Sequence, residues 1–126
     1  MKVSNPLERH FPDAVFAAGC PSRTVLDHVM SKWGLLVLLS LSDGEARRWS
    51  ELRRRAEGVS EKMLAQTLRT LVADGLVLRD ARPVVPPHVE YSLTERGREL
   101  AALLVPLMDW VVVHAPDILE DAAASA

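Results

Sequence analysis

A predicted helix over residues 61–74 carries side chains that can pair with DNA bases. Those on the side opposite its leucines are Lys62, Gln66, Arg69 and Thr70. A glutamine amide matches the edge of adenine, an arginine guanidinium matches guanine, and a threonine methyl can meet the methyl group of thymine. The alternative is an ordinary solvated helix face, because any surface helix exposes polar side chains.

The start of this helix adds a second kind of candidate. Ser60 is placed to cap it, and the Ser60 hydroxyl with the neighbouring backbone amides could hold a phosphate. In a helix-turn-helix, the N-terminal half of the second helix leads into the major groove. We therefore expect Ser60, Lys62, Gln66 and Thr67 to lie nearest the bases.

Cationic residues flank this helix in the sequence. Arg82 lies near the tip of a predicted hairpin, where it could reach a minor groove or a phosphate, and His88 is a weaker candidate on the same hairpin. Arg48 precedes the first helix of the motif, which should cross the DNA backbone. A solvated loop is the alternative for the hairpin.

The charge distribution favours an electrostatic footprint in the middle of the chain. The formal net charge is -2, but Arg47 to Arg98 contains eleven basic and seven acidic residues, or +4. The remainder carries -6, with four basic and ten acidic residues. A basic region between acidic flanks suits a nucleic-acid partner, although charge alone favours a solvated surface with no partner.

Cys20 is the one cysteine, so no internal disulfide can form, and a lone thiol suits a reducing cytoplasm. It becomes a redox-switch candidate if its pKa is lowered, and an idle thiol is the alternative. The histidines have no metal-ligand spacing, and no phosphate-binding glycine loop, nucleophile elbow or paired carboxylate motif occurs. We therefore expect no enzyme, catalytic residue, metal or cofactor.

Several elements must position these residues. An irregular arm over 1–21 precedes N-terminal helices within 22–45, the first capped by Ser22 or Thr24. Gly34 is expected to interrupt or follow that first helix, and the apolar run Leu35 to Leu41 favours a buried helix. The run is far too short for a membrane span, and no signal peptide is recognised at the start.

The region 47–93 reads as a helix-turn-helix followed by a wing. Arg47 to Trp49 could form a short strand, and a helix over 51–56 joins the helix 61–74 across Gly58 to Ser60. Strands near 76–79 and 89–93 enclose a proline-rich loop, which should protrude as the wing. The expected class is α+β, mainly α: a single winged helix-turn-helix domain with a two- to three-stranded sheet.

A long apolar helix over 94–115 should follow, with a frayed tail over 116–126. Pro106 should kink or break this helix. Its apolar stripe is too wide for so small a domain to bury, so a second copy of the chain is expected to cover it. The candidate interface residues are Leu100, Leu103, Leu104, Leu107, Trp110 and Val111.

The chain resembles the HxlR family of bacterial regulators, which are relatives of the MarR winged-helix group. The resemblance covers about residues 20–112. Its residues are Cys20-Pro21, Lys32-Trp33, Arg48 to Leu52, Gly58 to Leu64, Asp74 to Val77, Pro86 to Thr94, Gly97, Leu100 and Trp110. The segment Pro86-Pro87-His88-Val89-Glu90-Tyr91 is the most specific part. Two residues depart from the family pattern: Ser31 replaces a common Gly, and Trp49 replaces a common Phe. Neither departure affects the prediction of DNA binding.

The resemblance implies a bacterial, cytoplasmic, nucleoid-associated homodimer that binds a palindromic operator in double-stranded DNA, most plausibly as a repressor. Its N-terminal helices and long last helix would form the dimer. Some members sense oxidants or electrophiles through a cysteine near the N-terminus, and Cys20 occupies that position; a small-molecule or redox effector is therefore expected. The competing hypothesis is a winged-helix protein-interaction module without DNA binding.

Overall fold

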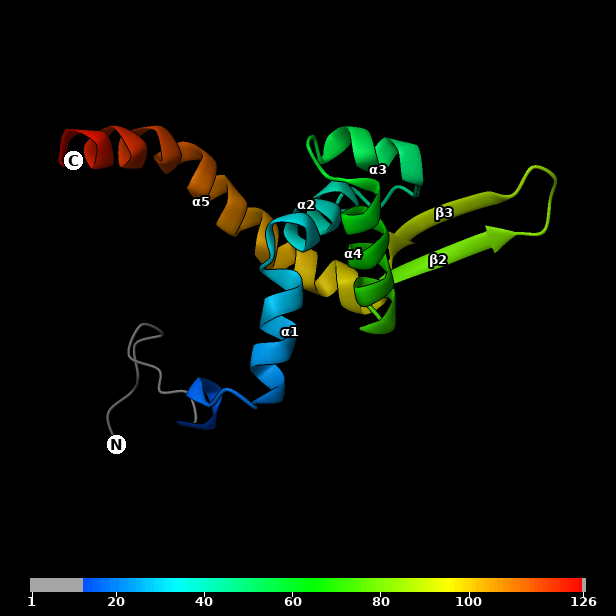
Figure 1. Cartoon of the computed structure of the whole chain (residues 1–126), viewed down its shortest axis with the longest axis horizontal. Coiled ribbons are helices and arrows are strands. Elements are labelled where there is room, and N and C mark those ends of the chain that lie inside the picture. Colours follow the sequence, from blue (N-terminus) through cyan, green and yellow to red (C-terminus); the bar gives the residue numbers. More distant parts are fainter. Residues whose placement is uncertain (1–12, 126) are drawn as a thin grey trace.

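The computed structural model describes residues 13–125, and Figure 1 shows a helical body with a protruding hairpin and a long last helix. Residues 1–12 of the expected arm lie outside the described residues. The elements are a 3-10 turn η2 (Asp13–Phe16), α1 (Pro21–Val29), α2 (Lys32–Ser40), β1 (Arg47–Arg48), α3 (Trp49–Arg55), α4 (Glu61–Ala73), β2 (Val77–Arg82), β3 (His88–Leu93) and α5 (Glu95–Ser125). The predicted class, mainly helical with a winged sheet, is confirmed.

The first two helices begin earlier than expected. Cys20, rather than Ser22 or Thr24, occupies the N-cap of α1, and Pro21 takes the first helical position, where its missing N–H is no loss. Gly34 neither interrupts nor follows α1 but lies inside α2, which Ser31 caps. A Cβ at Gly34 would come within 2.2 Å of the His28 carbonyl oxygen. The missing side chain therefore lets α2 pack closely against the end of α1.

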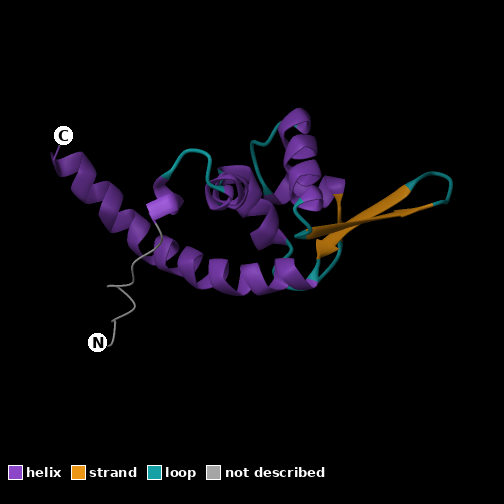
Figure 2. Cartoon of the chain, turned by 90° about the horizontal axis from the view of Figure 1, so that it is seen from below, coloured by secondary structure: helices purple, strands orange, loops and turns teal. Residues whose placement is uncertain are grey.

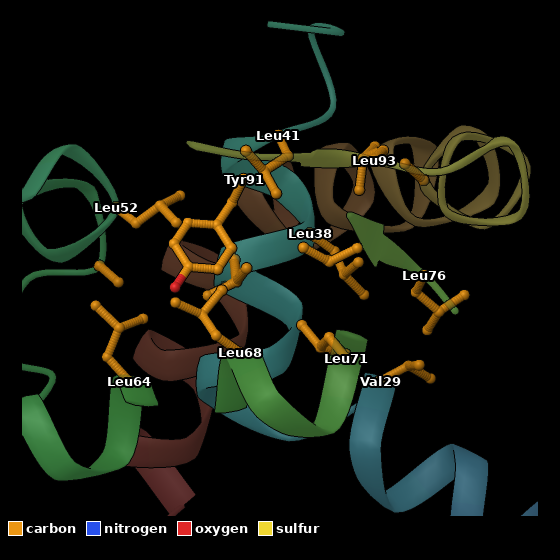
Figure 3. Packing of buried hydrophobic residues seen from close by; sticks show 14 of the residues in the cluster. Val29, Leu38, Leu41, Leu52, Leu64, Leu68, Leu71, Leu76, Tyr91 and Leu93 are labelled. Carbon is orange, nitrogen blue, oxygen red and sulfur yellow. The ribbon is translucent and has the colours of Figure 1, made fainter. Parts of the chain in front are cut away.

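The core forms around α2, and Figure 3 shows its leucines meeting those of α3 and α4 beneath the sheet. The side chains with 0% exposure are Leu38, Leu41, Leu52, Leu64 and Leu71. The spacing of Leu64, Leu68 and Leu71 puts all three on one face of α4. Burial of this face leaves the opposite face of α4 at the surface.

The three strands form an antiparallel sheet in the order β1-β3-β2. In the hairpin, Val77 pairs with Leu93 and Arg82 with His88, which leaves residues 83–87 as the connecting loop. Only Val77 of β2 is buried. The outer part of the hairpin therefore extends beyond the helical body, as a wing does (Figure 2).

The turn between α4 and β2 is fastened to the start of α5. The Thr94 hydroxyl donates to the Gly75 carbonyl at 2.6 Å and accepts from the Gly97 amide at 3.0 Å. The Thr94 amide donates to the Leu76 carbonyl at 3.1 Å. One threonine thus caps α5 and fixes where α4 ends and the wing begins.

The end of the last helix, α5, differs from the prediction. Residues 116–125 were expected to fray, but α5 continues to Ser125 with Pro106 and Pro116 inside it. Each proline removes one helical hydrogen bond, but the residues after Pro116 include Leu, Glu and several Ala, which favour helix. Figure 1 shows α5 bending toward its C-terminal end instead of breaking.

Most of α5 lies away from the core. Gly97, Ala101 and Leu104 are its buried residues. By length and composition alone, α5 is apolar enough to cross a membrane, a test that core helices of soluble proteins also pass. Its first turns pack against α2 and β3, so at least this end belongs to the folded body.

We predict that Gly97→Ala destabilises the fold. The added Cβ would lie 2.0 Å from the Leu76 carbonyl oxygen, so α5 must move away from the α4–β2 turn. Overpacking of this kind costs about 1–3 kcal/mol or more. Urea unfolding followed by circular dichroism measures the change. Glu99→Ala, at an exposed site of the same helix, should stay within about 0.5 kcal/mol of wild type. Equal stability of the two variants would contradict the prediction.

Candidate nucleic-acid interface

The turn between α3 and α4 sets the angle of α4, which carries most of the predicted base-contacting residues. Gly58 has a φ of +94°, a left-handed conformation that favours glycine. Ser60 then caps α4 as expected, because its Oγ accepts from the Met63 amide at 3.0 Å. Arg53 and Glu61 form an ion pair of 3.1 Å between the two helices, but its exposure makes its contribution to stability small.

The exposed face of α4 carries three of the predicted residues. Lys62, Gln66 and Arg69 are exposed at spacings of four and three residues, so they form one stripe along the helix. Their side chains point away from the buried leucines of the same helix. This stripe could meet the edges of several successive base pairs.

The two threonines of α4 are placed differently. Thr67 and Thr70 are half-buried on the flank of α4 that faces α1. With Asp27, His28 and Ser31, and with Gln66 at the edge of the stripe, they line a hollow of about 190 Å³. The stripe therefore unites Lys62, Gln66 and Arg69, whereas the threonines lie beside it. The period of a helix places Thr70 near the stripe, and only the position of α1 shows that it is partly covered.

Arg47 and Arg48, which precede α3, differ in their exposure and contacts. Arg48 is exposed, and its backbone amide donates to Glu51 Oε1 at 3.1 Å at the start of α3. Arg47 is half-buried: its Nε donates to the Ser40 carbonyl at 2.8 Å, and its guanidinium pairs with Asp43. Arg48 thus remains accessible to a phosphate, whereas Arg47 joins β1 to the end of α2.

On the wing, the two predicted residues share one carboxylate. His88 Nε2 lies 2.6 Å from Glu90 Oε2, and an Arg82 guanidinium nitrogen lies 3.5 Å from Glu90 Oε1. The hydrogen bond from His88, followed by the positive charge of Arg82, lowers the pKa of Glu90. Arg82 also lies 3.8 Å from Asp80. Arg82 is exposed, so a phosphate could replace its carboxylate partners at small cost, whereas the pair of His88 and Glu90 is half-buried. Sequence reasoning missed Glu90, although its position two residues from His88 on a strand was a signal.

Other cations of this region have no acidic partner. Within residues 13–125, no ion pair involves Arg54, Arg55, Lys62, Arg69 or Arg79. Unpaired cations beside an exposed helix attract a polyanion without first breaking ion pairs within the protein. The positive charge found in the sequence is therefore partly free in the fold. No group of three metal-ligating side chains was found in the described part of the chain.

Cys20 lies far from the stripe in sequence, at the N-cap of α1, and is half-exposed. A hydrogen bond from the Ser22 backbone lowers the pKa of the Cys20 thiol, against a weaker opposing effect of desolvation. The positive charge of Arg23 acts in the same direction. A lowered pKa raises the fraction of reactive thiolate near neutral pH.

The predicted interface residues of α5 do not all face the same way. Leu104 is 5% exposed and belongs to the core of this chain, and Leu100 packs against that core. Leu104 therefore has no surface to offer a partner, because the start of α5 is held against the body by the Thr94 contacts. Leu103, Leu107, Trp110 and Val111 are exposed. Sequence reasoning missed further exposed apolar residues, which are Val112, Val113, Ile118 and Leu119 on α5, Val25 and Leu26 on α1, and Met30 at the C-cap of α1.

Comparison with known proteins gives consistent matches. The family model described as HxlR-like helix-turn-helix matches residues 28–118. The uncharacterized HTH-type transcriptional regulator YtfH of Escherichia coli strain K12 is 52% identical over 105 residues, 83% of this chain and 82% of YtfH. A solved structure assigned as transcriptional regulator ytfH from Salmonella typhimurium aligns with a TM-score of 0.81 and 50% identity, over 86% of this chain and 96% of that chain.

A third match is a protein described as a redox regulator. The reduced form of HypR aligns with a TM-score of 0.71 and 38% identity, over 80% of this chain and 98% of that chain. Its oxidised form aligns with a TM-score of 0.68. The same fold is thus found in a protein whose description assigns it redox regulation.

Proposed function

The chain belongs to the HxlR-like helix-turn-helix family of transcriptional regulators, and we propose that it is a homodimeric repressor that binds a specific operator. The observation that carries the proposal is the exposed stripe of Lys62, Gln66 and Arg69 on the second helix of the motif. A helix in this position enters the major groove in known helix-turn-helix proteins. Such a role places the protein in the bacterial cytoplasm, at the nucleoid.

The remaining predicted residues have supporting roles in this proposal. Ser60 and Arg48, at the starts of α4 and α3, contact phosphates and fix the register of α4 on the duplex. Thr67 and Thr70 contact the groove wall from the flank of the stripe. Arg82 and His88 reach the adjacent minor groove or its phosphates from the wing. There a DNA phosphate would replace Glu90 as their ionic partner.

We predict that Gln66→Ala and Arg69→Ala each weaken specific binding by about 1–3 kcal/mol, the value of one two-fold base contact. The operator is first found by selection from random DNA, and binding is then measured by fluorescence anisotropy. Glu99→Gln, on α5, is the control and should bind as wild type does.

Two outcomes would contradict the proposal in different ways. If both α4 variants bind the operator like wild type, α4 is not the reading helix. If the wild-type chain binds no DNA even at low salt, where phosphate contacts are strongest, the protein-interaction module is favoured instead.

A dimer is proposed from the uncovered apolar surface of α5. Leu103 is 70% exposed and Trp110 54% exposed, on a helix whose second half has no buried residue. Large apolar patches on a soluble protein usually mark an interface, and two copies of one helix can cover each other about a two-fold axis. A two-fold dimer would present two α4 helices to half-sites of a palindrome, about one helical turn apart.

Accordingly, we predict that Leu107→Asp or Trp110→Asp converts the dimer to a monomer. Burying an unpaired carboxylate at the centre of an apolar interface should weaken association by at least about 2 kcal/mol. Sedimentation velocity measures the change, and circular dichroism checks that the helices remain. Leu78→Asp, at an equally apolar and exposed site on β2, should leave the assembly intact. A monomeric wild type, or a dimer in all three variants, would exclude α5 as the interface.

Oxidant sensing through Cys20 is proposed from the lowered pKa of its thiol and from the similarity to HypR. With no second cysteine in the chain, a disulfide must join two subunits or one subunit and a small thiol. Two thiols then lose two protons and two electrons to the oxidant. Because Cys20 caps α1, such a bond would alter the segment that leads into the folded body.

We predict that diamide changes the operator affinity of the wild type at least about fivefold, the low end of ordinary allosteric coupling. Cys20→Ser should show no such response. The same anisotropy titration, before and after treatment, measures both. An unchanged affinity in the treated wild type would remove the sensing role, whereas a response in Cys20→Ser would assign it to another residue.

A further inference from the structure

The C-terminal end of α4 is held by a side-chain contact that plays no part in the proposed DNA contacts. His28 Nδ1, in the last turn of α1, lies 2.8 Å from Oδ2 of Asp74, the C-cap residue of α4. The two side chains are half-buried, with exposed fractions of 30% and 20%. Among residues 13–125, this is the one side-chain hydrogen bond that joins α1 to α4 or to its cap. It therefore ties the first helix to the proposed reading helix.

Apolar packing does little to fix the angle between these two helices. Val29 is the buried residue of α1. Beside the contact, the hollow of about 190 Å³ lies between α1 and the flank of α4 that carries Thr67 and Thr70. Side chains that leave such a space do not interdigitate, so they do not fix the orientation of two helices. The angle between α1 and α4 therefore depends largely on the contact of His28 with Asp74.

The position of Asp74 also indicates a role outside its own helix. The C-terminal end of a helix carries a partial negative charge, so a carboxylate there is unfavourable for α4 taken alone. A hydrogen-bond donor from another helix offsets this cost, and His28 supplies one. The backbone of His28 is fixed in turn, because its carbonyl accepts from Ser31 Oγ at 3.0 Å and lies against Gly34 of α2. His28 is thus a fixed point from which Asp74 is held.

The same end of α4 is also attached to α5. Arg96 Nη1 donates to the Asp74 carbonyl at 3.3 Å, and the Thr94 hydroxyl holds the carbonyl of the next residue, Gly75. Both α1 and α5 carry exposed apolar residues at which the dimer is expected to form. The two α4 helices of a dimer would therefore be positioned from their C-terminal ends, whereas Lys62 lies near the opposite end, which leads into the major groove.

We propose that His28 and Asp74 are positioning residues that set the half-site spacing which the dimer accepts in its operator; this rests on the proposed function. Neither side chain contacts DNA. Together they hold each α4 at a fixed angle to the helices of the dimer interface. One added base pair at the centre of a palindrome moves a half-site by about 3.4 Å and turns it by about 34–36° around the duplex axis. A dimer with fixed α4 helices cannot follow this displacement, whereas a dimer without the contact follows part of it.

The test compares operators that differ in the distance between their half-sites. They are built from the half-sites found by selection, at the selected spacing and with one base pair added or removed. For the wild type, fluorescence anisotropy should show at least about a tenfold loss of affinity at either altered spacing, which is the loss expected for a broken base contact. His28→Leu and Asp74→Ala should lose less than about threefold there, although they bind the selected spacing more weakly than wild type does.

Three further variants separate the loss of this hydrogen bond from a general loss of stability. His28→Asn places an amide N–H near the position of Nδ1 and should restore the wild-type preference for spacing. The double variant of His28→Leu with Asp74→Ala should behave like either single variant, because all three lack one and the same contact. Asp43→Asn weakens the ion pair with Arg47, which lies outside α1 and α4, and should keep the full preference.

A structural role without positioning would give a different result. A less well folded chain binds every operator more weakly by one common factor, so an unchanged preference in His28→Leu and Asp74→Ala would overturn the proposal. Equal affinity of the wild type for all spacings would overturn it as well, as would a lost preference in Asp43→Asn or His28→Asn, or a weaker preference in the double variant than in either single one. The proposed function survives each of these results. A wild-type chain that binds no DNA, in contrast, would reject both.

Discussion

The close contact between the start of α5 and the turn that joins α4 to β2 fixes most of the geometry described above. Thr94 bonds to both sides of this contact, and Gly97 leaves room for the Leu76 carbonyl. Three parts of the molecule diverge from it: α4 with its exposed stripe, the wing, and the long helix α5. A shift at this point would change the angle between the reading helix and the wing together with the direction of the α5 surface.

Burial of one face of α4 determines what its other faces can do. The leucines of α4 are held by α2 and α3, which leaves Lys62, Gln66 and Arg69 at the surface. One flank of α4 faces α1, which partly covers Thr67 and Thr70, and the other flank faces the sheet.

The electrostatics of the interface combine free and paired cations. Arg54, Arg55 and Lys62 lie around the motif without ion pairs among the described residues, and in the proposed complex they would supply long-range attraction for DNA. On the wing, Arg82 and His88 share Glu90. Arg82 is exposed, so exchanging its carboxylate partners for a phosphate would cost little. A slightly acidic chain can therefore present a local basic surface.

Local signals in the sequence were enough for the element types, the cap at Ser60, the helix-turn-helix and the wing, because helical spacing, glycine and proline act over a few residues. The residues of the stripe followed from the same spacing, and the family resemblance was confirmed. Contacts between distant segments could not be read in this way. Only the tertiary structure showed that Leu104 is core, that Gly34 lies inside α2 and that Thr70 is partly covered by α1. It also showed that α5 continues past Pro116. The sequence could not predict this, because no local signal decides between a proline and the helix-forming residues that follow it. The space between α4 and the strand residues Tyr91 and Arg79 likewise depends on how closely these elements pack in three dimensions.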